Sequence, residues 1–117
     1  MTSEECSEEL VKEALELLRE ALENYLYSNC RKITSLARTA NQSKLRIELY
    51  GLFRYYSPSE NFPRFMNALS YVLRCSSIKE LKHYLGFEEF QLDESDERLS
   101  KLVFDLSKLE ELCSSLT

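Results

Sequence analysis

Hydrophobic positions recur with helical spacing over the first two thirds of the chain. Apolar residues fall at intervals of three and four between Val11 and Leu26, which predicts a helix from about residue 3 or 7 to residue 28. A shorter helix is predicted over residues 31–40, after the polar pair Ser28-Asn29. Another is predicted over residues 44–56. Its apolar face comprises Leu45, Leu49, Leu52, Phe53 and Tyr56.

Three serines with glutamate three positions later predict helix starts, because this pair forms a capping box. The first is Ser57-Pro58-Ser59-Glu60, where proline at the first helical position adds to the signal. The helix it opens has an apolar face of Phe62, Phe65, Met66, Leu69, Val72 and Leu73. The second, at Ser77, opens a helix to Leu85 that Gly86 ends in the left-handed conformation, with Phe87 as its hydrophobic lock. The third, at Ser107, opens the last helix.

After Gly86 the hydrophobic period changes from 3.6 to 2. Alternation around Phe90 and Leu92, and again from Leu102 to Leu106, predicts two short strands, with Phe104 inward and Lys101 outward or near the edge. Strand structure is expected only in this stretch, and the polar connection over residues 93–100 is expected to be mobile. The chain is therefore predicted to be a single domain, residues 1–117, of the α+β class. It should be mostly helical, with five to six helices and a small C-terminal β-hairpin.

Charge and composition narrow the class of protein. The 117 residues carry a net charge of −5, which argues against a nucleic-acid binder held by phosphate contacts. No apolar run is long enough for a bilayer, and an acidic stretch follows Met1 in place of an apolar signal segment. An intracellular, cytoplasmic protein with neither membrane nor nucleic acid as partner is expected.

Cysteine and histidine provide no pattern for a metal or a cofactor. The four cysteines (Cys6, Cys30, Cys75 and Cys113) form no C-x-x-C pair, and His83 is the single histidine. We therefore expect no metal, no cofactor and four reduced thiols in a domain whose length supports a full core.

Catalytic chemistry is not indicated either. The adjacent carboxylates Glu88 and Glu89 point to opposite faces of a strand, and His83 has no nucleophile or carboxylate partner in sequence. With no nucleophile–base pair and only two glycines, the chain is not expected to be an enzyme. The basic stretch over residues 31–46 is either a solvated helix face or a contact for a polyanion or acidic peptide.

Aromatic residues concentrate around the Ser57 turn, and they do not all fit one helical face. They are Tyr50, Phe53, Tyr55, Tyr56, Phe62, Phe65 and Tyr71. They are either core residues with incidental exposure or the lining of a groove between helices, which is a common docking place for apolar peptides.

The order of motifs over residues 44–116 resembles the PUB domain of peptide N-glycanase and certain UBX proteins. The matching segments are the proline-containing turn at Ser57, the cluster Phe62-Pro63-Arg64-Phe65 and then Asn67. Gly86-Phe87-Glu88-Glu89, Leu102-Val103-Phe104 and the leucine-rich last helix follow in the same order. The chain departs from the family pattern in its shortened basic-aromatic cluster, in a shorter interval from Asn67 to Gly86 and in its long 93–100 loop.

The resemblance implies a non-catalytic module that binds the extended C-terminal tail of a hexameric AAA+ unfoldase, the valosin-containing protein. In that case Asn67 would hydrogen-bond the backbone of the tail, Arg64 would supply positive charge, and Phe62 and Phe65 would wall the pocket. The expected function is thus a protein-interaction adaptor that binds a partner peptide, tail or helix in an aromatic-lined groove. The alternative is a helical structural subunit whose exposed apolar surface is an oligomer interface.

Overall fold

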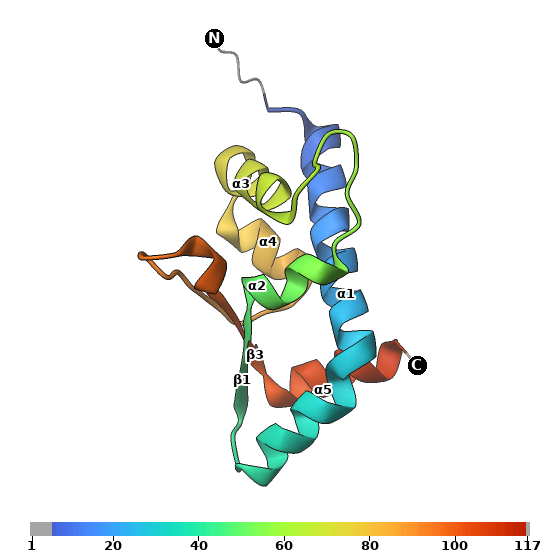
Figure 1. Cartoon of the computed structure of the whole chain (residues 1–117), viewed down its shortest axis with the longest axis vertical. Helices are drawn as coiled ribbons and strands as arrows, with labels where there is room; N and C mark the ends of the chain where they lie inside the picture. Colours follow the sequence, from blue (N-terminus) through green and yellow to red (C-terminus); the bar gives the residue numbers. More distant parts are fainter. Residues whose placement is uncertain (1–5, 117) are drawn as a thin grey trace.

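The computed structural model describes residues 6–116 and arranges them around one long helix, α1 (Glu8–Thr39) (Figure 1). Three further helices pack on α1: α3 (Phe65–Cys75), α4 (Ile78–Leu85) and α5 (Leu106–Ser115). The residues that α1 buries follow the predicted spacing: Ala14, Leu15, Leu18, Ala21, Leu22, Leu26 and Ala37. In Figure 1, α3 and α4 lie beside the first half of α1 and α5 beside its second half. The predicted mostly helical α+β class is confirmed.

The predicted break at Ser28-Asn29 is wrong, because α1 continues through it. The side-chain amide of Asn29 donates to the carbonyl of Tyr25 (2.9 Å) and to the hydroxyl of Tyr55 (3.2 Å). Because the Asn29 amide has hydrogen-bond partners within and beside the helix, it does not compete with the helical backbone bonds, and the helix continues. Since residues 8–39 contain neither glycine nor proline, nothing else in the sequence interrupts the helix.

The first half of the predicted 44–56 helix is a strand, β1 (Lys44–Glu48). It pairs antiparallel with β3 (Lys101–Asp105), with Leu45 opposite Phe104 and Ile47 opposite Leu102. A short strand, β2 (Glu89–Gln91), pairs with the other edge of β3, so the sheet order is β1-β3-β2. The expectation of strand only after Gly86 is therefore wrong. The alternation of charged and apolar residues in the β1 sequence is the period-2 signal that the helical reading passed over.

The chain after β1 forms two short turns and then an irregular segment. Helix α2 (Leu49–Leu52) and the 3-10 turn η1 (Phe53–Tyr55) are followed by residues 56–64 without helix, so the capping box predicted at Ser57 does not form. Pro63 restricts the residue before it to extended conformations, which excludes a helix that runs through Phe62. The Ser59 hydroxyl instead accepts from the Phe62 N–H (3.1 Å).

The C-terminal third is closest to prediction. Ser77 caps α4, and Gly86 ends it with φ 87°, in the left-handed region. Strands β2 and β3 occupy the two predicted stretches, and Phe104 is fully buried while Lys101 is half-buried. They are joined through the 3-10 turn η2 (Glu97–Leu99). The N-cap of α5 is Asp105, whose carboxylate accepts from the Lys108 N–H (3.3 Å), so the cap predicted at Ser107 is wrong.

All four cysteines are paired in disulfides, which contradicts the prediction of reduced thiols. Cys6 is bonded to Cys75 across a Cα–Cα distance of 5.4 Å, and Cys30 to Cys113 across 6.0 Å. The partners are separated by 69 and 83 residues, so their proximity is a property of the fold and not of any local motif. Cys6 lies just before α1 and is joined to the last residue of α3, whereas Cys30 lies within α1 and is joined to α5.

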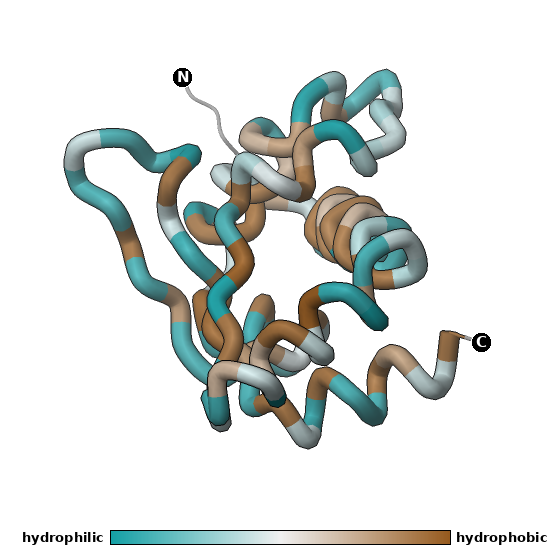
Figure 2. Tube along the Cα trace, turned by 60° about the horizontal axis from the view of Figure 1, so that its bottom comes forward, coloured by the Kyte–Doolittle hydropathy of each residue, from teal (hydrophilic) through white to brown (hydrophobic). Residues whose placement is uncertain are grey.

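Hydropathy follows this arrangement. In Figure 2 the connection between β2 and β3, which extends furthest to the left in both views, is mostly hydrophilic. The buried residues of α1 from Ala14 to Leu26 belong to one hydrophobic cluster with residues of the other helices and of the sheet. The hydrophobic core therefore lies between α1, the other helices and the sheet, and the β2–β3 connection stands at its margin.

Candidate functional site

The most distinctive hollow of the surface is a pocket beside the irregular segment 56–64. We call it the aromatic–arginine pocket. Its volume is about 440 Å³, and its lining is Phe53, Tyr56, Pro58, Pro63, Arg64, Phe65, Met66 and Arg98. Three of these residues are aromatic and two are prolines, so the walls are mostly apolar and rigid.

The aromatic walls are held by contacts with one another and with the backbone. The ring of Phe65 lies 5.3 Å from that of Phe53 and 5.8 Å from that of Tyr56, measured between centroids. The Tyr56 hydroxyl donates to the carbonyl of Phe62 (2.6 Å), and burial raises the pKa of this phenol. The carboxylate of Glu13 on α1 accepts from Ser59 (2.8 Å) and Asn61 (3.1 Å), which ties the segment to the long helix. The pocket is therefore formed before any ligand arrives.

Both charged residues that line the pocket are arginines, although the chain is acidic overall. Within residues 6–116, no ion pair or side-chain hydrogen bond engages the guanidinium of Arg64, which is exposed. Arg98 donates to Asp96 through two nitrogens, at 3.1 and 2.9 Å. This pairing lowers the pKa of the Asp96 carboxyl and orients the Arg98 guanidinium. The pocket thus has one uncompensated cation and one partly compensated cation, which favours a ligand with a negative charge.

Arg98 reaches the pocket because the β2–β3 connection is organised by hydrogen bonds. Fully buried Ser100 accepts from the Asp93 N–H through its hydroxyl (2.9 Å), and its carbonyl accepts from Leu49 at the start of α2 (2.9 Å). The Asp93 carboxylate accepts from Ser95 and from the backbone of Asp96, bonds that lower the pKa of Asp93. The connection that was expected to be mobile therefore contains a hydrogen-bonded turn, and this turn positions Arg98 at the pocket.

The four residues predicted to form a site occupy different positions. Arg64 and Phe65 line the pocket, with Arg64 exposed and Phe65 only 4% exposed. Phe62 is buried (4% exposed), with its ring 5.4 Å from that of Tyr71, and it belongs to the core. Asn67 is exposed, and its side-chain oxygen accepts from the backbone N–H of Arg64 (3.1 Å). This bond satisfies the side-chain oxygen of Asn67. It also makes Asn67 part of the N-terminal cap of α3, where it holds the backbone of Arg64 in place.

Sequence reasoning missed Tyr56 and Arg98 as site residues. Tyr56 was included in the aromatic set but assigned to the apolar face of a helix that does not form. Arg98 lies in a polar connection with no motif, and only the pairing of β2 with β3 brings it toward α3. No signal in the sequence could have found it.

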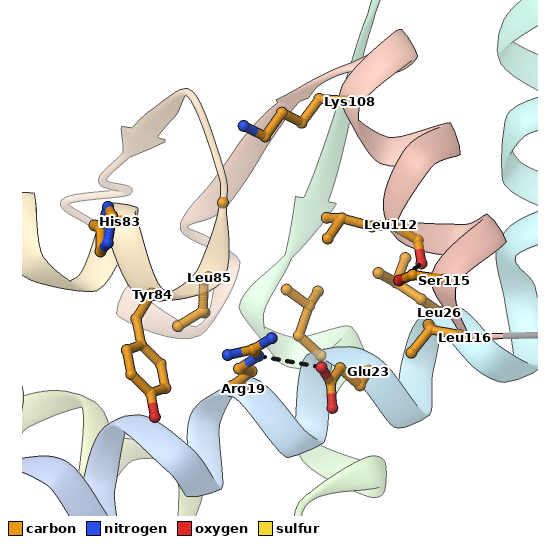
Figure 3. A pocket seen from close by; sticks show the side chains of 12 residues that line it. Arg19, Glu23, Leu26, His83, Tyr84, Leu85, Lys108, Leu112, Ser115 and Leu116 are labelled. Carbon is orange, nitrogen blue, oxygen red and sulfur yellow. Dashed lines mark hydrogen bonds and ion pairs between the residues drawn. The ribbon is translucent and has the colours of Figure 1, made fainter.

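A second cavity, of about 240 Å³, lies between α1, α4 and α5 (Figure 3). Leu85 and Leu112 face it beside the cationic side chains of Arg19 and Lys108 and the imidazole of His83. The Arg19 guanidinium is paired with Glu23 (3.1 Å), and its central carbon lies 5.5 Å from the ring centroid of Tyr84. Because the guanidinium of Arg19 is already paired with Glu23, which also lines this cavity, the cavity is the weaker candidate for an anionic ligand.

Within residues 6–116, no group of three or more histidine, cysteine or acidic side chains is arranged to hold a metal ion. None of the helices in the same range is both long enough and apolar enough to cross a membrane.

Comparisons with protein-family models, with curated proteins and with solved structures gave no match for this chain. The PUB resemblance, the adaptor function and the absence of catalysis therefore stay predictions.

Proposed function

We propose that this domain is a non-catalytic protein-interaction module that binds the C-terminal tail of a partner protein in the aromatic–arginine pocket. The observation that carries the proposal is the lining itself: aromatic and proline walls with arginine as the only charged residue type. Apolar walls bury the side chains of a tail, and a guanidinium pairs with its terminal carboxylate through charge-assisted hydrogen bonds.

Preorganisation also supports this function. The rings that wall the pocket contact one another, and the capping bond from Asn67 fixes the backbone at Arg64. Little ordering is then required when a peptide binds, which reduces the entropic cost of association. The two arginines of this pocket would attract an anionic tail although the chain is acidic overall.

The PUB resemblance suggests a specific partner, the tail of the AAA+ unfoldase valosin-containing protein. The proposed roles of the four predicted residues then divide. Arg64 contacts the tail, and Phe65, which is 4% exposed, forms part of the pocket wall. Asn67 and Phe62 position them, because Asn67 accepts the backbone N–H of Arg64 and Phe62 is buried against Tyr71.

The test uses the full chain and two probes in fluorescence anisotropy. One is a fluorescein-labelled decapeptide from the unfoldase C-terminus, and the other is the best binder selected from a displayed peptide library with free C-termini. Each is compared with its C-terminal amide. We expect micromolar binding of the free acids and a loss of about tenfold on amidation, because one charge-assisted contact is removed.

Arg64→Ala is the diagnostic variant, and Arg31→Ala is its control, since Arg31 is an exposed arginine on α1 outside this pocket. We expect about tenfold weaker binding for Arg64→Ala, with a reduced dependence on salt, and no change for Arg31→Ala. Failure to select any free-acid peptide, or equal effects of the two variants, would overturn the proposal. Concentration-dependent elution as a dimer would favour the structural-subunit alternative.

A further inference from the structure

An apolar groove lies next to the aromatic–arginine pocket, between α3 and β2. We call it the leucine groove. It measures about 320 Å³, and its apolar lining includes Leu49, Met66, Leu69, Leu73, Phe90 and Leu92. Leu69 is buried, but Leu73 and Leu92 stand at the groove with 40% and 61% of their surface exposed. Large apolar side chains exposed together beside a hollow are typical of a surface that a ligand covers.

The leucine groove and the aromatic–arginine pocket adjoin at two points. Met66 lines both of them. The turn η2 also borders both, because Glu97 lines the leucine groove and its neighbour Arg98 lines the pocket. Methionine is unbranched and adapts to irregular ligands, which suits a residue at such a junction. The two hollows therefore lie next to each other along α3, on either side of Met66, and we call them together the path from Arg64 to Leu73.

The length of this path sets the ligand that fits it. Eight residues of helix separate Phe65 from Leu73, a distance of about 12 Å at 1.5 Å per residue. An extended peptide advances about 3.4 Å per residue, so about three or four of its residues span the same distance. Arg64 and Arg98 are at one end of the path. The exposed leucines are at the other end, where the guanidinium carbon of Arg74 lies 5.4 Å from the ring centroid of Tyr71.

We propose that the tail bound by this domain is an extended peptide that places an apolar side chain, three or four residues before its terminal carboxylate, between Leu73 and Leu92. The inference rests on the proposed function and adds the ligand class to it. The charge distribution favours a tail over a second copy of this chain, because the end of the path with Arg64 needs an anion.

The experiment is a double-mutant cycle between peptide and protein. The probes are fluorescein-labelled hexapeptides with free C-termini that share the sequence of the best library binder. Leucine or serine stands at each upstream position in turn. The protein variants are Leu92→Ser and Leu36→Ser. Leu36 is a matched control because it is 60% exposed on α1 and lines neither hollow. Urea unfolding of each variant verifies that it is folded.

With the wild-type chain we expect leucine three or four residues before the terminus to bind about tenfold more tightly than serine there, because an apolar side chain is buried. In Leu92→Ser this preference falls to less than about twofold, whereas in Leu36→Ser it is retained. The amidation effect at the arginine end persists in both variants, since coupling is confined to groups in contact.

Each other result overturns the inference in an identifiable way. If free-acid peptides bind but the upstream position makes no difference, or the preference survives in Leu92→Ser, the groove is not part of the site and the proposed function stands. If no free-acid peptide binds, both fail. If light scattering shows a wild-type dimer that Leu92→Ser dissociates, a second copy occupies the groove.

Discussion

Single residues in this protein have roles that depend on the partner each one finds. Asn67 and Arg64 are three positions apart, yet the exposed asparagine serves the arginine by accepting its backbone N–H. Glu13 on α1 acts on the pocket from a distance by holding Ser59 and Asn61. Side chains that touch no ligand can therefore decide the geometry of a binding surface.

Asn67 offers a prediction that separates capping from ligand binding. Asn67→Asp retains the oxygen that accepts the Arg64 N–H, so its free energy of unfolding should stay within about 0.5 kcal/mol of the wild type. It also places a carboxylate near the Arg64 guanidinium, so tail peptides should bind more weakly. Asn67→Ala removes the cap and should cost about 1 kcal/mol. Urea unfolding and anisotropy on the same samples provide both quantities.

The same data test whether Asn67 contacts the peptide backbone directly. If Asn67→Ala and Asn67→Asp weaken binding equally at matched folded fraction, the amide itself contacts the peptide, and capping is not its main role.

At the level of elements, strength of local signal decided which predictions were correct. Helix α4 has a serine cap, a glycine in the left-handed conformation and an apolar face within ten residues, and it formed as predicted. The 44–56 segment carries apolar residues compatible with both periods, and pairing with β3 made its first part a strand. The hydrogen bonds of β1 come from residues more than fifty positions away, so no local rule could weigh them.

Helix α3 supplies a matched pair for stability. Leu69 is 3% exposed and Leu73 is 40% exposed on the same helix. Leu69→Ala should lower the free energy of unfolding by about 2–5 kcal/mol, because it leaves a cavity in the core, whereas Leu73→Ala should cost less than about 1 kcal/mol. Phe53 in η1 is half-buried, so Phe53→Ala should cost less than Leu69→Ala. Equal losses for the two leucines in urea unfolding would mean that α3 presents a different face to α1.

On the scale of the whole molecule, the two disulfides connect the beginning of the chain to its later helices. Cys6–Cys75 joins the start of α1 to the end of α3, and Cys30–Cys113 joins the second half of α1 to α5. Together they attach the long helix covalently to α3 near its beginning and to α5 in its second half. Disulfides persist mainly in oxidising compartments, so the two bonds do not fit the intracellular location expected from the sequence.

Removing either disulfide should destabilise the fold substantially. The bonds close loops of 69 and 83 residues in sequence separation, and crosslinks of this kind contribute about 2–4 kcal/mol each. We expect the double variants Cys6→Ser/Cys75→Ser and Cys30→Ser/Cys113→Ser to unfold at lower urea concentration than the wild type. The control is the wild type under a phosphine reductant, which should lose stability as well. An unchanged midpoint after reduction, with four free thiols by mass spectrometry of the alkylated protein, would contradict a structural role.

The amino-acid sequence by itself determined the class of this protein and much of its last third. Four correctly predicted features are local properties of the chain. They are the mostly helical periodicity, the apolar face of α1 as far as Leu26, the end of α4 at Gly86 and the strand around Phe104. Each depends on side-chain periodicity or on the φ preference of one residue, and these can be read without knowing what lies nearby.

Only the tertiary structure decided the rest. The third strand, the unbroken length of α1, both disulfides and the position of Arg98 all depend on partners distant in sequence. The aromatic–arginine pocket belongs to this group, because its walls come from η1, from the irregular segment before α3, from α3 itself and from the β2–β3 connection. The physical reason is that hydrogen-bond partners and neighbouring rings determine the state of short elements. Those neighbours are supplied by the fold as a whole.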